Sequence, residues 1–447
     1  MKHIIIGGVA AGMSAASKIK RIQKDASIHV YAKGAFLSYG ACGLCYFIAG
    51  MNDDYNKMIA RTREEFEEQG IKTFLRSEAV GVHVRSKTVT IKNLDTGEII
   101  RETYDKLMIA TGAEAVRPPI DGIDKKGVYT LKTLEDGLCL KKEITRYGIK
   151  DVVIVGGGYI GIEMAEALHA LGKRVVCLEA AERILLPFDV EIADLALAEI
   201  KRHGVEIKTG EKVLSFKGGG SVNAVVTENG EYIADAVVVA TGVKPSTGFL
   251  ADTGIAMEAN GAVIVDRQMR TSVPDVYSAG DCAVVYDRMK KKNVYLPLGA
   301  VANKCGRIAG GNMCGGSEEF PGALSSAALK VFDLQLGRTG LGEKEAAENG
   351  FDFGTVFVEG RSHPIYYPGS EPLMIKLVYE KPSMKILGAQ LCGKDGAALR
   401  TDIFAVAIHA GMTTKELGMI DLIYSPPYAG VWDAVHIACN AAKQPHQ

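Results

Sequence analysis

The chain has 447 residues, about three times the length of a typical domain, so two or three domains are expected rather than one. Hydrophobic residues make up 47% of the chain and charged residues 23%, a composition that excludes a disordered or collagen-like protein. The formal charge of −1 gives no global field that would attract nucleic acid or an anionic membrane, and no apolar run reaches the ~18 residues of a membrane span. We therefore expect neither nucleic acid nor a membrane as a partner.

The chain opens with an apolar strand, 3–6, that is followed by a glycine turn and a helix. The turn reads Gly7-Gly-Val-Ala-Ala-Gly12, and glycines at such a turn let the pyrophosphate of a dinucleotide approach the start of the helix. Val9 stands where the middle glycine is usual, and Ala32 stands where an acid is usual after the next strand. This turn alone is therefore a weak signal.

Nine cysteines are scattered along the chain, and only Cys42 and Cys45 form a close pair. This spacing is not that of a secreted disulfide framework, so we expect the protein in the cytosol. A stretch that resembles a helix, 46–49, follows the pair, and the start of a helix favours a thiolate. We expect Cys42 to be a redox nucleophile and Cys45 to resolve a mixed disulfide. The alternatives are two inert thiols or half of a metal site, and the lack of a second such pair disfavours zinc.

A second copy of the strand, glycine turn and helix begins at 152–155. In its turn Gly156 allows the tight bend, Gly158 lets the backbone approach a pyrophosphate, and Gly161 packs the helix against the strand. Glu179 ends the next strand at the spacing at which an acid binds a ribose 2′-hydroxyl, which favours NADH over NADPH.

Each copy closes with a later strand that ends in Ala-Thr-Gly, at Thr111-Gly112 and at Thr241-Gly242. Short apolar strands followed by helices predict parallel, doubly wound sheets, and the internal repeat predicts two of them with a dinucleotide site each.

A further strand ends in Gly280-Asp281, and a helix is expected around 302–311. An acid at a strand end beside a second helix terminus suits the ribitol and pyrophosphate of a flavin, which favours FAD in the first site. Beyond about residue 323 the pattern changes to alternating strands at 355–358, 373–379 and 385–391, followed by a helix at 397–410. This part is predicted to be an α+β unit.

Two groups of polar residues have both a functional and an ordinary explanation. The prolines after Tyr424 stiffen its segment, so the phenol could exchange a proton with a substrate, or the segment could be an interface turn. Tyr366 and Tyr367 are a weaker case of the same kind. Lys18 and Arg21 could bind phosphates or could be the solvated face of the first helix.

Taken together, these motifs resemble those of the FAD- and NAD(P)H-dependent pyridine nucleotide-disulfide oxidoreductases. The similar branch contains coenzyme A disulfide reductases, NADH oxidases and persulfide reductases. The resemblance covers the whole chain, and the motifs that carry it are Gly7 to Gly12, Ser38-Tyr-Gly-Ala-Cys42, Tyr104 to Ala113, Gly156 to Glu163, Ser278-Ala-Gly-Asp281, Ala302 to Arg307 and Tyr424-Ser-Pro-Pro.

The resemblance implies an α/β fold with two doubly wound (Rossmann-like) domains and a C-terminal α+β dimerisation domain, and a homodimer. It implies an FAD-binding domain at 1–113 and 243–322, an NAD(P)H-binding domain at 114–242 and a dimerisation domain at 323–447.

The same resemblance implies a role for particular residues. The FAD site would contain Gly7, Gly8, Gly12, Lys33, Val80, Thr111, Gly112, Asp281 and Ala300. The NADH site, with NADPH possible, would contain Gly156, Gly158, Tyr159, Gly161, Glu163, Glu179 and Gly242. A coenzyme A site would contain Lys18, Arg21, Ser38, Asn303 and Arg307. The catalytic nucleophile would be Cys42, with Tyr424 and Tyr366 or Tyr367 from the other subunit. Cys45 is added to the catalytic residues on the spacing of the cysteine pair and not on the resemblance.

The expected reaction passes electrons from NADH through FAD to Cys42 and on to a low-molecular-weight disulfide or persulfide. Peroxidases and water-forming oxidases of this branch usually carry a histidine where this chain has Ala10, which disfavours them. Ala41 and Cys45 depart from the residues usual beside the nucleophile, so the substrate stays open. The alternatives are an NADH oxidase that reduces oxygen and a flavin-bound redox sensor with low turnover.

Overall fold

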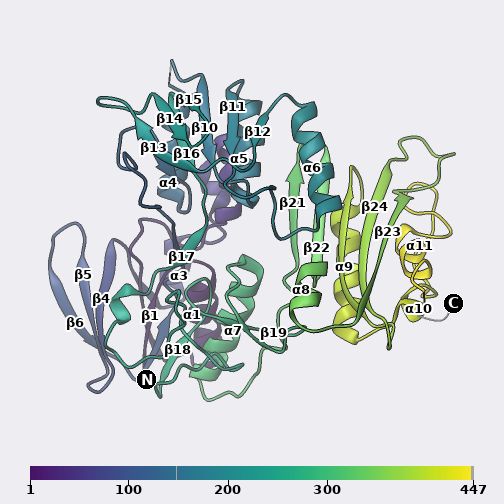
Figure 1. Ribbon diagram of the computed structural model, residues 1–447. Helices are drawn as coiled ribbons and strands as arrows, with labels where there is room; N and C mark the ends of the chain where they lie inside the picture. The colour runs from purple at the N-terminus through teal and green to yellow at the C-terminus, as the bar shows by residue number, and fades with distance from the viewer. Residues whose placement is uncertain (147, 444–447) are drawn as a thin grey trace. The chain divides into compact units, whose positions relative to one another are not determined.

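The computed structural model describes residues 1–146 and 148–443, which divide into two compact units (Figure 1). Unit 1 consists of Met1–Pro118, Tyr129–Gly148 and Thr241–Ala323. Unit 2 consists of Pro119–Val128, Ile149–Ala240 and Leu324–Gln447. Among the described residues, no helix has both the length and the apolar character needed to cross a membrane.

Unit 1 is built on a parallel five-stranded sheet. Its strands, in spatial order, are β18 (Val276–Ser278), β7 (Lys106–Ile109), β1 (Lys2–Ile6), β2 (Ser27–Tyr31) and β3 (Ile71–Phe74). The central strand β1 is almost entirely buried because helices cover the sheet, as its continuous apolar sequence predicts.

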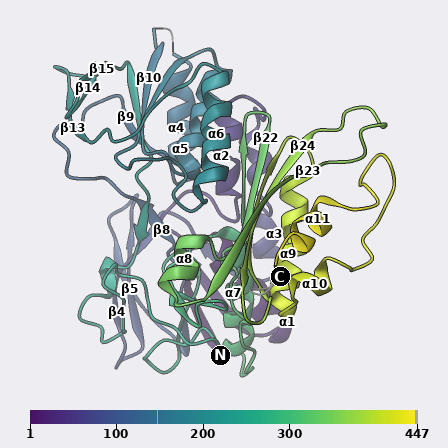
Figure 2. The same ribbon diagram turned by 45° about the vertical axis from the view of Figure 1, so that its right-hand side comes forward.

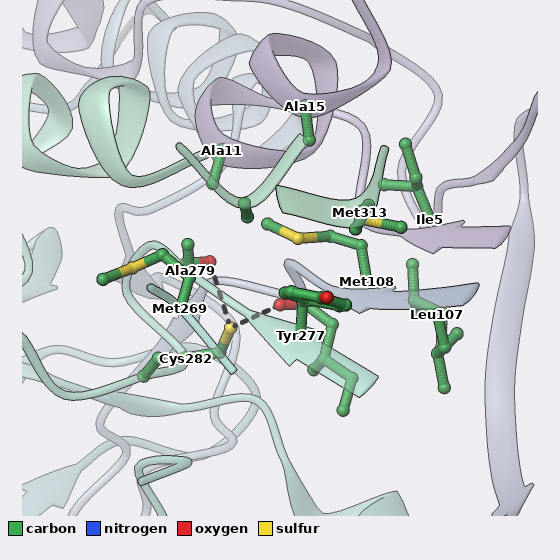
Figure 3. Packing of buried hydrophobic residues seen from close by; sticks show 14 of the residues in the cluster. Ile5, Ala11, Ala15, Leu107, Met108, Met269, Tyr277, Ala279, Cys282 and Met313 are labelled. Atoms are coloured by element: carbon green, nitrogen blue, oxygen red, sulfur yellow. Dashed lines mark hydrogen bonds between the residues drawn. The ribbon is translucent and has the colours of Figure 1, made fainter. Parts of the chain in front are cut away.

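Two helices of unit 1, α1 (Ala10–Ile22) and α7 (Gly299–Met313), pack at very short range. A Cβ atom on Gly306 would lie 2.3 Å from the carbonyl oxygen of Ala11, so only glycine permits this approach. Figure 3 shows Ala11 and Ala15 of α1 facing the core that contains Met108 and Met313.

The remaining elements of unit 1 are short helices and antiparallel strands around this core. The helices are η1 (Ala41–Gly43), α2 (Leu44–Ile48), η2 (Tyr55–Met58), α3 (Arg63–Glu68), α4 (Leu134–Ile144) and η3 (Gly248–Leu250). The antiparallel strands are β4 (Ser77–His83), β5 (Thr88–Asn93) and β6 (Ile99–Thr103), the pair β8 (Ala113–Ala115) and β17 (Val243–Pro245), and the pair β19 (Val285–Asp287) and β20 (Lys292–Val294).

Unit 2 contains a second sheet of the same kind. Its strands, in spatial order, are β12 (Glu206–Lys208), β11 (Arg174–Leu178), β10 (Asp151–Val155), β16 (Ala236–Val239) and β9 (Val128–Thr130). Strands β10, β11, β12 and β16 are parallel, and the helices of this part are α5 (Tyr159–Ala170) and α6 (Val190–Arg202). A small antiparallel sheet is formed by β13 (Val213–Lys217), β14 (Ala224–Thr227) and β15 (Glu231–Ile233).

The C-terminal part of unit 2 is an antiparallel sheet (Figure 2). Its strands, in spatial order, are β21 (Ala327–Val331), β22 (Leu334–Gly340), β25 (Ile386–Gly393), β24 (Pro372–Glu380) and β23 (Phe353–Arg361). The helices are α8 (Glu343–Glu348), α9 (Ala397–Ala410), α10 (Thr414–Leu417) and α11 (Ala434–Asn440). The strands and the long helix predicted for this part are confirmed.

The protein is therefore α/β, with two parallel sheets of the dinucleotide-binding kind and an antiparallel C-terminal part, as the sequence predicts. Three segments within 114–242 are grouped differently from the sequence-based division, and the longest of them contains α4. Tyr129–Gly148, which contains α4, belongs to unit 1 although it lies within 114–242. The physical reason is that α4 packs on α2, where the side chain of Leu44 fills the space beside Gly137.

Candidate functional site

The two glycine turns have the same internal geometry. Gly7 and Gly156 have φ angles of +115° and +112°, which favour glycine. A Cβ atom on Gly12 would lie 1.9 Å from the carbonyl oxygen of Gly7, and one on Gly161 would lie 1.9 Å from that of Gly156. These four glycines are therefore required by the packing of helix on strand, in each unit separately.

Gly158 is different, because no packing contact requires it. It caps the N-terminus of α5, and a Cβ atom built on it would have no neighbour within 4 Å. A small residue at an open helix N-terminus fits the approach of a nucleotide phosphate to the backbone. Gly8 in the first turn is closely packed by contrast, since a Cβ atom on it would lie 2.2 Å from Cδ2 of Leu37.

Glu179 is held at the carboxyl end of β11 by two backbone groups. Its Oε2 accepts a hydrogen bond from the N–H of Gly157 at 2.6 Å, and its Oε1 accepts one from Ala181 at 2.8 Å. Both bonds orient the carboxylate beside the glycine turn, where an acceptor for ribose hydroxyls is expected.

Tyr159 and Glu163 lie on the first turns of α5, and both are half-buried. The Tyr159 ring packs edge-on against Phe188 with 6.0 Å between centroids. Burial raises the pKa of the Tyr159 phenol, so it stays protonated at neutral pH. Gly242, the last residue predicted for this site, has a φ of +110° and belongs to unit 1, where its carbonyl accepts a hydrogen bond from Val116 at 2.9 Å.

In unit 1, Thr111, Gly112 and Asp281 follow neighbouring parallel strands, β7 and β18, and so lie at the same edge of the sheet. The buried Oγ1 of Thr111 has no hydrogen-bond partner, and Gly112 has a φ of +69° with open space beside its Cα. Asp281 accepts a hydrogen bond from Nζ of Lys132 at 2.8 Å. An unpartnered hydroxyl, an open glycine and an oriented carboxylate at one sheet edge fit the ribitol and pyrophosphate of a flavin.

No sequence motif predicts a role for Lys132 in this site. It precedes the capping box of Thr133 and Asp136 that begins α4, a signal that predicts a helix start but not an ion pair with Asp281.

Three other residues predicted to bind the flavin are exposed or form an ion pair elsewhere in unit 1. Ala300 is exposed on the first turn of α7, and Val80 is exposed on β4. The ammonium group of Lys33 lies 2.7 Å from a carboxylate oxygen of Glu78.

The cysteine pair lies in a turn that is tied to the first glycine turn. Cys42 is exposed in η1, Cys45 is buried in α2, and neither sulfur forms a disulfide. Ser38, with a φ of +50°, donates its N–H to the carbonyl oxygen of Gly8 at 2.9 Å. Since Ser38 is four residues before Cys42, the exposed thiol is anchored close to the predicted flavin site.

Helix α2 is only five residues long, and α4 supports it. Lys141 of α4 donates to the carbonyl oxygen of Phe47 at 2.8 Å and to Asp53 at 3.0 Å, and its ammonium group lies 4.1 Å from the centre of the Phe47 ring. No local sequence pattern predicts this support, because it joins two residues that are 94 positions apart in the chain.

The residues predicted to bind coenzyme A are grouped on α1 and α7, apart from Ser38. Asn303 accepts a hydrogen bond from Oγ of Ser14 at 2.8 Å, which links the two helices. Lys18 lies beside Gly311 of α7, and Arg21 and Arg307 are exposed on the same two helices. The helix pair therefore carries three cations with access to solvent.

Tyr366 and Tyr424, 58 residues apart in the chain, are brought together in unit 2. Their hydroxyl oxygens are 2.9 Å apart, and both rings are exposed. The hydrogen bond to Tyr424 raises the pKa of Tyr366. Tyr367 is not part of this pair, because its ring packs against His363 with 5.5 Å between centroids.

Comparisons with known proteins identify relatives over the whole chain. The family model described as pyridine nucleotide-disulphide oxidoreductase matches residues 1–301, and the model of its dimerisation domain matches residues 326–435. A NAD(P)H coenzyme A polysulfide/persulfide reductase of Pyrococcus horikoshii is 36% identical over 99% of this chain and 98% of its own length. An NADH oxidase of Enterococcus faecalis is 31% identical over 99% of both chains. The solved structure of a NAD-dependent persulfide reductase from A. fulgidus superposes with a TM-score of 0.95 at 36% identity, covering 98% of this chain and 82% of that one.

Proposed function

Because the chain belongs to the pyridine nucleotide-disulphide oxidoreductase family, we propose that it is an NADH-dependent flavoprotein that uses Cys42 to reduce a low-molecular-weight disulfide or persulfide of the coenzyme A type. The family uses FAD and NAD(P)H. The observation that carries the proposal is the exposed thiol of Cys42 in a turn whose backbone binds the first glycine turn through Ser38 and Gly8.

Apart from Gly242, which belongs to unit 1, the residues proposed for the two cofactors lie in different units of the chain. In unit 1, Thr111 and Asp281 would bind FAD, with Lys132 holding the Asp281 carboxylate in place. In unit 2, the backbone at Gly158 would bind the pyrophosphate of NADH, and Glu179 would accept from its ribose. FAD supplies the two-electron transfer between nicotinamide and sulfur. Glu179 disfavours the 2′-phosphate of NADPH because two negative charges would meet there.

The sulfur chemistry is assigned to the two cysteines. The Cys42 thiolate attacks one sulfur of the substrate disulfide, which forms a mixed disulfide and releases the other half as a thiolate. The Cys45 thiolate then attacks the Cys42 sulfur, which releases the second half and leaves a Cys42–Cys45 disulfide to be reduced by two electrons.

Coenzyme A as the carrier of the sulfur is supported by the cations on α1 and α7. Lys18, Arg21 and Arg307 would pair with its phosphates, and Asn303 would lie between them. The relative from P. horikoshii is named a coenzyme A polysulfide/persulfide reductase, which is the same substrate class.

The dimerisation-domain match suggests a homodimer, in which the Tyr366–Tyr424 pair of one subunit would reach the Cys42 site of the other. We also propose the division of the chain into an FAD domain (1–113 and 243–322), an NAD(P)H domain (114–242) and a dimerisation domain (323–447).

An anaerobic titration with NADH, followed by flavin absorbance, tests the proposal. The protein should take up two electrons before the flavin bleaches, and coenzyme A disulfide or a persulfide should then restore the oxidised spectrum. Cys42→Ser should bleach with the first equivalent and should not be restored by either compound. If wild type bleaches at once and only oxygen restores it, Cys42 does not carry the electrons and the proposal fails.

The second candidate is an NADH oxidase that reduces oxygen, with Cys42 passing through a sulfenic acid. It is favoured by the E. faecalis relative, which is named an NADH oxidase. Rapid NADH consumption under air, without added disulfide and dependent on Cys42, would select this candidate.

A further inference from the structure

The hydroxyl groups of Tyr366 and Tyr424 are in contact although neither ring is buried. Tyr366 lies in the loop between β23 and β24 (residues 362–371), and Tyr424 lies in the loop between α10 and α11 (residues 418–433). Their side chains are 69% and 49% exposed. Packing of the rings therefore does not hold the hydroxyls 2.9 Å apart, and the backbones of the two loops must do so.

One side chain binds both loops. Nη2 of Arg400, on α9, donates to the carbonyl oxygen of Ser362 at 2.8 Å and to that of Tyr428 at 3.0 Å. Ser362 is four residues before Tyr366, and Tyr428 is four residues after Tyr424. The same guanidinium group therefore fixes one backbone position in each loop. In both loops this position is four residues from the tyrosine.

The guanidinium group is itself fixed. Its Nε donates to both carboxylate oxygens of Asp433, at 3.1 Å and 2.9 Å, and these side chains are only 12% and 5% exposed. Asp433 also caps α11 by accepting from the N–H of Val435 at 2.9 Å. On the other side, a Cβ atom on Gly396 would lie 2.1 Å from Nη1 of Arg400, so glycine at that position leaves room for the group.

Each loop is also stiff within itself, so that one anchor point is enough to place its tyrosine. In the first loop, Oγ of Ser370 donates to the carbonyl oxygen of His363 at 2.6 Å, and Arg361 donates to Ser370. In the second loop, His436 bonds the carbonyl oxygen of Ile420 at 2.9 Å, and Tyr428 donates its N–H to Ser425.

We propose that Arg400 is a positioning residue, which fixes the two loops relative to each other and so keeps the hydroxyls of Tyr366 and Tyr424 in hydrogen-bond contact for the reaction at Cys42. The inference rests on the proposed function of these tyrosines. Arg400 touches no reacting atom, and its effect on turnover passes entirely through the pair.

The first test is hydrogen–deuterium exchange of the full-length holoenzyme, read by mass spectrometry. Since removing Arg400 alone leaves a buried carboxylate unpaired, the double variant Arg400→Gln/Asp433→Asn is used beside the single one. Faster exchange is expected in both loops at once. Arg361→Gln is the matched control, because within 1–146 and 148–443 the guanidinium group of Arg361 donates to Ser370 alone, so its loss should loosen only the first loop. Unchanged exchange, or faster exchange in one loop only, would overturn the inference.

The second test couples Arg400 to Tyr424 in a double-mutant cycle. Reoxidation of the NADH-reduced enzyme by coenzyme A disulfide should slow roughly 10- to 100-fold in Arg400→Gln/Asp433→Asn, the range expected for misplaced groups. Adding Tyr424→Phe should cause no further loss, and reduction by NADH should be unchanged throughout. Additive losses would show that Arg400 acts elsewhere and would overturn the inference. If Tyr424→Phe alone reoxidises as wild type, the role proposed for the tyrosines fails, while the exchange experiment still decides whether Arg400 joins the loops.

Discussion

Burial separates eight of the nine cysteines into two groups, and Cys314 is intermediate. Cys42 and Cys139 are exposed, whereas six others are buried. Burial raises the pKa of Cys177, Cys305 and Cys392 to about 12, because the interior disfavours the thiolate. At pH 8 a thiol of that kind is ionised in roughly one molecule in ten thousand, so it is a poor nucleophile.

We expect iodoacetamide at pH 8 to modify Cys42 and Cys139 well before Cys177, Cys305 or Cys392 of the folded protein. Peptide mass spectrometry after short exposures measures the order, and labelling in guanidinium chloride gives the reference for the unfolded chain. Cys139 serves as the internal control, since a disulfide substrate should protect Cys42 and leave Cys139 reactive. Equal labelling of Cys305 and Cys139 would contradict the assignment.

The role proposed for Cys45 makes a separate prediction. Cys45→Ser retains Cys42 but lacks the resolving thiol, so the enzyme should stop as a mixed disulfide on Cys42 after one turnover with coenzyme A disulfide. Intact-protein mass spectrometry should show one coenzyme A adduct per chain. Cys139→Ser should show none and should turn over normally. Absence of the adduct in Cys45→Ser would mean that Cys45 does not resolve the intermediate.

At the scale of an element, two glycines in the turn of unit 2 have different roles, one in packing and one in cofactor binding. Gly161→Ala places a methyl group 1.9 Å from the carbonyl oxygen of Gly156, and we expect it to lower the stability by about 1–3 kcal/mol, as overpacking does. Gly158→Ala meets no atom within 4 Å and should fold normally. If the backbone there contacts the pyrophosphate, its KM for NADH should rise, with the melting temperature within a few degrees of wild type. A normal KM in Gly158→Ala would exclude that contact.

A polar contact between α6 and the turn joining β21 to β22 makes the stability of the folded protein depend on pH. Hydrogen bonds from Arg202 hold the pKa of Glu199 at about 2, below its usual range, and Arg202 also donates to Asp333 at 2.6 Å. The stabilisation is present above the ordinary carboxyl pKa and is lost as the pH falls through the lowered one.

Wild type should therefore lose stability between about pH 4.5 and pH 2 through this group. Glu199→Gln removes the titrating carboxylate, so the stability difference between the two proteins should shrink as the pH falls from 5 toward 3. Denaturant unfolding at several pH values measures it. A difference that stays constant with pH would show that Glu199 does not carry the effect.

The two strand–turn–helix units and the C-terminal strands with their long helix could be predicted from the sequence because each depends on local patterns. Apolar runs, the glycine turns and the acid of Glu179 each lie within one strand–helix unit. The Lys132–Asp281 ion pair, the support of α2 by Lys141 and the Tyr366–Tyr424 contact could not be predicted in this way. Each joins segments between 58 and 149 residues apart, and no local pattern encodes which charged or phenolic groups meet. The family resemblance points to these tyrosines but does not predict the hydrogen bond between them.

At the scale of the whole molecule, the C-terminal part of unit 2 exposes an unusually large set of apolar side chains. Helix α9 buries Phe404 and Ile408 against the sheet, yet Leu399 and Val406 on its other face are 78% and 68% exposed. A helix that is apolar on both faces is usually buried on both. Ile423 and Trp432, in the loop between α10 and α11, are also exposed. An exposed apolar surface of this kind is typical of a face that a second subunit covers.

Trp432 is the single tryptophan of the chain and is 58% exposed, so its fluorescence should report this contact directly. If a second copy covers the face, emission should shift to the red as the protein is diluted to a monomer. Val406→Glu should give the red-shifted emission at all concentrations and half the mass by light scattering, because a charge on this face opposes burial. Ile233→Glu, at an equally exposed residue outside the segment matched by the dimerisation model, should leave both unchanged. A dimer that persists in Val406→Glu with unaltered emission would place the interface elsewhere, and the tyrosine pair would then have no reason to face the Cys42 site of a partner.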